Sequence, residues 1–230
     1  MSRKDDRELL TGGKTTPGVV RIGEAVHRPA SPRSPFIAAL LNHLESVGFC
    51  GAPRYLGQDS SGHDRFSFLP GQVPRELGYF SDAQLIRAAA LIRDFHDATV
   101  GFAARGTEEV ICHGDLSPCN CVFRSDAPTA LIDFDAAAPG SRADDVGYAL
   151  WLWLDLGADG LSAAEQDRRV NLFVAAYGPG VKDPVAAVLA AQARLAADRG
   201  AKSATREWAR ACEKWTLMNL AGAGSDRRPG

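Results

Sequence analysis

The sequence predicts an α+β fold, in which a small antiparallel β-sheet is followed by a mainly helical region. Short strand-like runs separated by Gly and Pro turns dominate residues 1–70. From residue 71 onwards, long stretches repeat apolar residues at helical spacing. With 230 residues, of which 45% are hydrophobic, the chain can bury a sizeable core. We therefore expect two closely packed lobes, residues 1–70 and residues 71–230.

In the first lobe, residues 8–13, 19–23 and 25–28 read as three short strands. Ser34 is expected to cap a helix that has Pro35 in its first turn and ends at Gly48. Two more strands are predicted at residues 53–56 and 65–69, around a turn. This succession is typical of a small antiparallel sheet with one helix packed on it.

In the second lobe, Ser81 and Asp82 are expected to start a helix that continues to Thr99. His96 lies near the end of that helix, where a cation is favourable to the helix dipole. Strands are predicted at residues 110–112, 121–123 and 129–132. Four helices should follow, and their predicted ranges are 146–154 after an Asp144–Asp145 cap, 163–177, 183–199 and 203–220. Asp145 is interpreted as structural because it introduces an almost entirely apolar helix.

Composition limits the partners and the location that we expect. The net charge is −2, so there is no basic excess that would favour nucleic acid or a membrane surface. The first ten residues lack the apolar stretch of a signal peptide, and no later window is apolar for long enough to span a membrane. We therefore expect a cytoplasmic protein, either a monomer or a homodimer.

Five cysteines, an odd number, disfavour a disulfide framework. Cys119 and Cys121 flank Asn120, but a zinc site would need two further ligands, and only His113 lies near. We expect these two cysteines to be small buried residues.

Polar residues cluster between residues 111 and 135, around the three short strands. His113-Gly114-Asp115-Leu116-Ser117-Pro118-Cys119-Asn120 follows the first strand, and Ile132-Asp133-Phe134-Asp135 follows the third. The strand, the loop and the hairpin should bring Asp115, Asn120 and Asp133 to one end of a small sheet. The alternative is that these residues only cap turns, where Asp and Asn are common. The five-residue spacing from Asp115 to Asn120 favours a shared site.

These two motifs resemble those of the aminoglycoside phosphotransferase family, which is related to protein kinases. The resemblance implies a protein-kinase-like two-lobe fold, with a β-sheet N-terminal lobe and a mainly helical C-terminal lobe. It implies that Asp115 accepts the proton of the acceptor hydroxyl and that Asn120 and Asp133 bind Mg²⁺. Asp135 is interpreted as a further metal ligand or as a partner of a backbone amide. His113 is expected in the catalytic loop, where it braces the loop rather than transferring a proton.

The same resemblance assigns the nucleotide to the first lobe, with departures from the family pattern. The glycine loop is reduced to Gly12 and Gly13, whose backbone can approach phosphate. Arg28 stands where a Lys is expected, and we predict that Glu45 pairs with it. Whether Arg28 replaces that Lys as a phosphate contact stays open. Phe68 and Leu69 lie in the predicted link between the lobes, where the backbone would contact a purine.

The predicted function is that of a small-molecule kinase. It would transfer the terminal phosphate of ATP or GTP to a hydroxyl of an antibiotic or of a sugar- or nucleoside-type metabolite. The weak glycine loop and the missing Lys leave a second interpretation, a nucleotide-binding pseudokinase without phosphotransfer.

Overall fold

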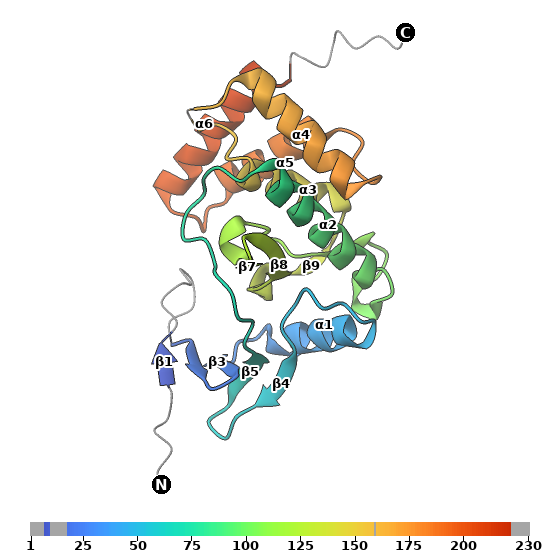
Figure 1. Cartoon of the computed structure of the whole chain (residues 1–230), viewed down its shortest axis with the longest axis vertical. Helices are drawn as coiled ribbons and strands as arrows, with labels where there is room; N and C mark the ends of the chain where they lie inside the picture. Colours follow the sequence, from blue (N-terminus) through green and yellow to red (C-terminus); the bar gives the residue numbers. More distant parts are fainter. Residues whose placement is uncertain (1–6, 10–17, 159, 222–230) are drawn as a thin grey trace.

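The computed structural model describes residues 7–9, 18–158 and 160–221. Its first part is a five-stranded antiparallel sheet in the order β1-β2-β3-β5-β4. The strands and the one helix of this part are β1 (Arg7–Leu9), β2 (Val20–Ile22), β3 (Ala25–Pro29), α1 (Ser34–Ser46), β4 (Tyr55–Gln58) and β5 (His63–Ser67). The predicted hairpins are therefore confirmed within the described residues. Figure 1 shows this sheet and α1 at one end of the molecule.

The second part is mainly helical and encloses two short strand pairs. β6 pairs with β9, and β7 pairs with β8, both antiparallel. The elements are α2 (Asp82–Thr99), β6 (Val110–Cys112), β7 (Cys121–Arg124), β8 (Ala127–Leu131), β9 (Ala138–Gly140), α3 (Arg142–Trp153), α4 (Ala163–Tyr177), α5 (Pro184–Ala197) and α6 (Ser203–Asn219). In Figure 1 the strand pairs lie between the helices and the N-terminal sheet. The predicted α+β fold is confirmed.

Local sequence signals account for most helix starts. Ser81 and Gln84 form a reciprocal capping box on α2, in which each side chain accepts from the other residue's backbone N–H. Helix α4 has the predicted bounds, and Ser162 caps it. Helix α3 begins before the predicted Asp pair, at Arg142, because Ser141 caps it through the Asp144 N–H. Asp145 consequently lies inside the helix and not at its start.

The predicted cap of α1 is wrong. Ser34 is the first residue of the helix, and its hydroxyl donates to the buried Asp64 carboxylate on β5. The residue at the cap position is Arg33, which makes no side-chain cap hydrogen bond. A contact from a neighbouring strand therefore fixes the start of this helix in place of a local cap.

One hydrophobic core runs through both parts of the chain. Helix α2 buries Leu85, Ile92 and Phe95 completely, and α1 contributes Leu40 and Leu44 to the same cluster. Burying a side chain of this size stabilises the fold by about 1.5–3 kcal/mol. None of the described helices combines the length and the apolar character needed to cross a membrane.

The helices of the second part pack around the polar loop that follows β6.

Candidate active site

The loop after β6 brings Asp115 and Asn120 into contact. The Asn120 amide donates from Nδ2 to the Asp115 carboxylate at Oδ2, 2.7 Å away, and to the Asp115 carbonyl, 3.0 Å away. A short 3-10 turn over Pro118–Asn120, capped by the Ser117 hydroxyl, produces this geometry. The five-residue spacing therefore does place the carboxylate and the amide in one site.

Asp133 reaches the same site from the end of β8. The Ile132 N–H donates to the Asn120 carbonyl at 2.9 Å, so the residue before Asp133 is joined to the catalytic loop. Asp133 has φ 65° and ψ 67°, the left-handed conformation. Asp tolerates this region better than most residues, and such strain concentrates at functional sites. A Cβ on Gly114 would lie 2.6 Å from the Ala136 carbonyl, which shows how closely the two segments pack.

Arg28 on β3 crosses from the N-terminal sheet to these acids. Its Nη2 donates to Asp135 Oδ1 at 2.6 Å. Its Nη1 lies 3.7 Å from Asp133 Oδ1, an ion-pair distance that is too long for a hydrogen bond. The predicted Glu45–Arg28 pair is therefore wrong: Glu45 pairs with Arg54 at 3.2 Å. Arg28 faces the acids directly because β3 and not α1 points at them.

Of the remaining predicted nucleotide residues, Phe68 and Leu69 have contacts within the N-terminal part. Gly12 and Gly13 lie outside the described residues. The Phe68 N–H donates to the Glu24 carbonyl at 2.8 Å, and the Arg21 guanidinium lies 3.7 Å from the Phe68 ring centre. Leu69 and Glu45 line a separate small pocket between α1 and the β4–β5 hairpin.

His113 is fully buried and braces the loop. Its Nε2 lies 3.0 Å from the Ile132 carbonyl, and its Nδ1 accepts the Asp115 N–H at 3.3 Å. This pattern assigns the proton to Nε2. Burial lowers the pKa of the His113 imidazole, although Asp145 and Asp115 act in the opposite direction. A neutral, enclosed imidazole fits the predicted bracing role and offers no proton to a substrate.

Two residues of α3 complete the site, and the sequence did not identify their roles. The buried Asp145 accepts the N–H groups of His113 and Gly114 at 2.7 and 2.9 Å. Tyr148 donates its hydroxyl to Asp115 Oδ1 at 3.0 Å. The available signal was an acidic residue within an apolar helix, because a buried charge requires partners.

His96 was expected to serve the helix dipole, but it is buried against Asp145 instead. Its Nε2 lies 3.0 Å from Asp145 Oδ2, and its Nδ1 lies 2.8 Å from the Tyr177 hydroxyl. On its own, burial would raise the pKa of Asp145, but the hydrogen bond with His96 lowers it below its usual range. His96 thus helps to keep this loop anchor ionised.

The acid cluster fits a divalent cation. Asp133 Oδ1 is buried and has no hydrogen-bond partner among the described residues. Burial and the charge of Asp135 raise the pKa of Asp133, which Arg28 offsets only in part. Ionised Asp115, Asp133 and Asp135 with one Arg28 guanidinium carry two net negative charges. Since the Asn120 amide nitrogen is held by Asp115, its oxygen is the atom left for a metal, and Mg²⁺ prefers such oxygen ligands.

Cys119 and Cys121 are free thiols on either side of Asn120. Across the described ranges, no three His, Cys, Asp or Glu side chains form a group arranged for a metal ion. The residues predicted to hold magnesium differ from such a group because one of them, Asn120, would contribute an amide oxygen. Cys121 is buried and Cys119 is half-buried, in line with the expectation of small packed residues.

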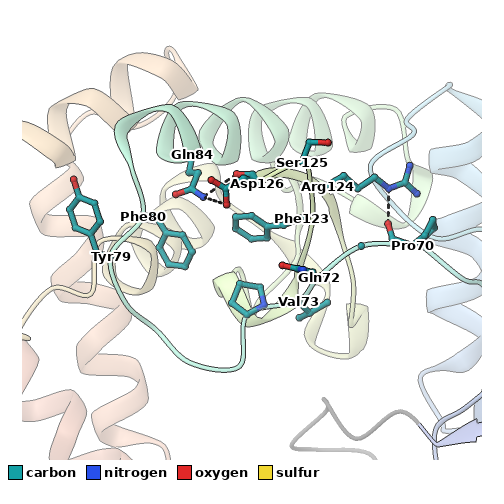
Figure 2. A pocket seen from close by; sticks show the side chains of 12 residues that line it. Pro70, Gln72, Val73, Tyr79, Phe80, Gln84, Phe123, Arg124, Ser125 and Asp126 are labelled. Carbon is teal, nitrogen blue, oxygen red and sulfur yellow. Dashed lines mark hydrogen bonds between the residues drawn. The ribbon is translucent and has the colours of Figure 1, made fainter.

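A larger cavity lies beside this site. Figure 2 shows a pocket of about 770 Å³ between the segment 70–80 and the β7–β8 turn. Its polar side chains bond within its own wall: Gln84 donates to Asp126, and Arg124 donates to the Pro70 carbonyl. None of the predicted site residues lines it. The acid cluster and this pocket are therefore lined by different residues.

Comparison with known proteins gives the family. A model described as the phosphotransferase enzyme family matches residues 102–188, which include the whole catalytic loop and the acid pair. The trifolitoxin immunity protein of Rhizobium leguminosarum bv. trifolii is 31% identical over 197 residues, which cover 76% of this chain and 74% of that protein. The chain belongs to the phosphotransferase enzyme family. The predicted resemblance is confirmed, and the reaction class is phosphotransfer to an alcohol group.

Solved structures show the fold of this phosphotransferase. Choline kinase from Cryptosporidium parvum Iowa II superposes with a TM-score of 0.62 at 11% identity, over 95% of this chain and 89% of that chain. Macrolide 2'-phosphotransferase from Brachybacterium faecium gives 0.53 at 17% identity, over 84% and 87%. The streptomycin–ATP complex of APH(2'')-IIa gives 0.55 at 14% identity, over 83% and 84%. The protein-kinase-like fold is therefore confirmed.

Proposed function

We propose that the phosphotransferase moves the terminal phosphate of ATP to a hydroxyl group of an antibiotic-type small molecule. The observation that carries the proposal is the fixed Asp115 carboxylate, held by Asn120, together with the buried Asp133 Oδ1, which has no hydrogen-bond partner among the described residues. A relative named for trifolitoxin immunity supports a protective role. A solved structure of the same fold that contains ATP and streptomycin supports the donor. GTP is the alternative donor.

In this proposal Asp115 orients the acceptor hydroxyl and takes its proton as the new P–O bond forms. The bond between the terminal phosphorus and the bridging oxygen breaks, and the nucleoside diphosphate leaves with the electron pair. Phosphoryl transfer needs mainly positioning and charge stabilisation, so one firmly positioned carboxylate is sufficient as the general base. The hydrogen bond from Asn120 holds one oxygen of this carboxylate, Oδ2, within the loop.

Asn120 and Asp133 would hold Mg²⁺, with Asp135 as a further ligand. Mg²⁺ bound there would hold the nucleotide phosphates and neutralise their charge. Arg28, which already lies between the acids and the sheet, is the cation placed to meet a phosphate oxygen. We propose residues 1–70 as the nucleotide-binding lobe, with Gly12, Gly13, Phe68 and Leu69 on the nucleotide side, and residues 71–230 as the catalytic lobe.

The acceptor is expected to carry little positive charge. Residues 140–224 contain ten Asp and Glu and ten Lys and Arg, so this helical region has no acidic excess. A polycationic aminoglycoside would favour an acidic pocket. We therefore favour a neutral hydroxyl-bearing antibiotic, and a sugar- or nucleoside-type metabolite is the second candidate class.

A phosphotransfer screen tests the proposal. Purified protein is incubated with Mg²⁺ and either ATP or GTP over a panel of neutral antibiotics, aminoglycosides, sugars and nucleosides, and the mass gain of one phosphate is recorded. We expect transfer by the native protein, a residual rate about 100- to 10,000-fold lower in Asp115→Asn, and normal transfer by Asp94→Asn, an exposed control on α2. Normal transfer by Asp115→Asn would reject the base assignment. Nucleotide binding without transfer to any compound would favour the pseudokinase.

A further inference from the structure

Side chains of helix α3 form hydrogen bonds with three consecutive residues of the loop after β6. Asp145 and Tyr148 are three residues apart and therefore lie on one face of the helix. Asp145 accepts the backbone N–H groups of His113 and Gly114, and Tyr148 reaches the next residue, Asp115. The same helix thus fixes both the backbone of the loop and the side chain of the proposed base.

The Asp115 carboxylate has one donor on each oxygen. Asn120 donates to Oδ2 at 2.7 Å from within the loop, and Tyr148 donates to Oδ1 at 3.0 Å from α3. With only the Asn120 bond, the carboxylate could still turn about that contact. Two donors from separate elements fix the plane of the carboxylate, so the remaining lone pairs point in set directions.

The Tyr148 hydroxyl is itself held in place. Its ring packs edge-on against Trp151, with centroids 6.1 Å apart, and Trp151 is fully buried and stacked on Trp208 at 4.5 Å. Burial and the neighbouring Asp115 charge raise the pKa of the Tyr148 phenol, so it stays a donor at all working pH values. The donor is therefore rigid and permanent.

We propose that Tyr148 is a positioning residue for phosphotransfer, which acts by holding Asp115 Oδ1 so that the carboxylate faces the acceptor hydroxyl. The inference rests on the proposed role of Asp115 as the base. It goes beyond that role because it assigns a function to a side chain of α3 outside the two motifs. Tyr148 need not bind the nucleotide, since its hydroxyl is directed at the carboxylate.

The test compares the native protein, Tyr148→Phe, Asp115→Asn and the double variant. The assay follows Mg²⁺-ATP with water as acceptor, and any compound that gains phosphate in the screen. We expect Tyr148→Phe to lower kcat about 10- to 100-fold, the loss typical of a displaced catalytic group, with the KM for ATP unchanged. In the Asp115→Asn background, removal of the Tyr148 hydroxyl should cause no further loss. A purely structural role would lower both backgrounds equally and would overturn the proposal.

Tyr55→Phe is the matched control, because the Tyr55 hydroxyl also donates to an aspartate, Asp64, at 3.3 Å, but within the N-terminal sheet. It should leave kcat unchanged. A crystal structure of Tyr148→Phe gives a second readout that does not depend on turnover. We expect the Asp115 carboxylate to be rotated or spread over several orientations. An Asp115 carboxylate in the native orientation would overturn the positioning role of Tyr148, whether or not the native protein is active. Inactivity of the native protein would be a different result and would reject the proposed function.

Discussion

Replacing Asp145 with Asn should loosen the catalytic loop while the overall fold survives. The carboxylate accepts three hydrogen bonds, two at Oδ2 from His113 N and His96 Nε2 and one at Oδ1 from Gly114 N. An Asn side chain has one acceptor oxygen, so at best it keeps the two at Oδ2 and turns its own NH₂ towards the Gly114 N–H. Two buried donors then lack acceptors, at about 1–3 kcal/mol each. We expect a loss of about 2–6 kcal/mol in the free energy of unfolding.

Urea denaturation at pH 7.5 measures this loss, and turnover is measured on the same samples. We expect kcat to fall about 100-fold, because a shift of the loop by about 1 Å is enough for such an effect. Asp144→Asn is the matched control: Asp144 is exposed and pairs with Arg194 at the surface, so the cost should stay below about 1 kcal/mol. Equal stability and equal turnover in Asp145→Asn and Asp144→Asn would refute the anchoring role of Asp145.

Three further outcomes are expected. Asp133→Asn should reduce turnover by about 1000-fold or more, and Arg28→Met by about 10- to 100-fold. The difference is expected because the proposed metal ligand supplies the larger electrostatic stabilisation. The turnover of both variants is measured by steady-state kinetics at saturating Mg²⁺. Burial lowers the pKa of His113 in the folded protein, so as the pH falls the unfolded chain binds a proton first, near the usual value of 6.5. The free energy of unfolding should therefore fall as the pH drops below about 6.5 and level off below the lowered pKa of the folded state. Urea titrations from pH 8 to pH 5 should show this slope, and a slope of the opposite sign would contradict the prediction. Gly147→Ala should destabilise by about 1–3 kcal/mol, because the new Cβ would lie 2.3 Å from a backbone carbonyl of α5, whereas Gly78→Ala, with open space around it, should be neutral in thermal unfolding.

Periodicity and spacing predicted the elements and the catalytic loop because both depend on local sequence. Helix α4 has the predicted bounds, and α2 begins at the predicted cap. Asp115 and Asn120 meet because five residues, with Pro118 among them, are enough to define one tight turn. In each case the contact that matters lies within a few residues of chain.

Two of the wrong predictions, those for Ser34 and Glu45, concern partners that are distant in sequence. Ser34 is a residue type that often caps helices, but its hydroxyl donates a hydrogen bond to Asp64, which lies thirty residues later on β5. Glu45 is on the expected helix, but it forms an ion pair with Arg54, which lies in the segment that follows α1. A hydrophobic pattern shows which face of an element is buried and leaves open which polar side chain meets it there. Such choices depend on register between elements, which a single sequence does not state.

Arg28 and Glu45 have separate partners. Glu45 pairs with Arg54, and the Arg28 guanidinium lies 2.6 Å from Asp135 and 3.7 Å from Asp133. Arg33, at the start of α1, donates to the carbonyl of Ala137 just beyond the same acids. Two arginines from one short stretch of the N-terminal part thus hold the segment 133–137. A planar guanidinium can contact two carboxylates at once, which a single ammonium does less well. If Asp133 holds the proposed divalent cation, the cation would share this carboxylate with Arg28, and a phosphate oxygen of the nucleotide would be an alternative partner for the guanidinium.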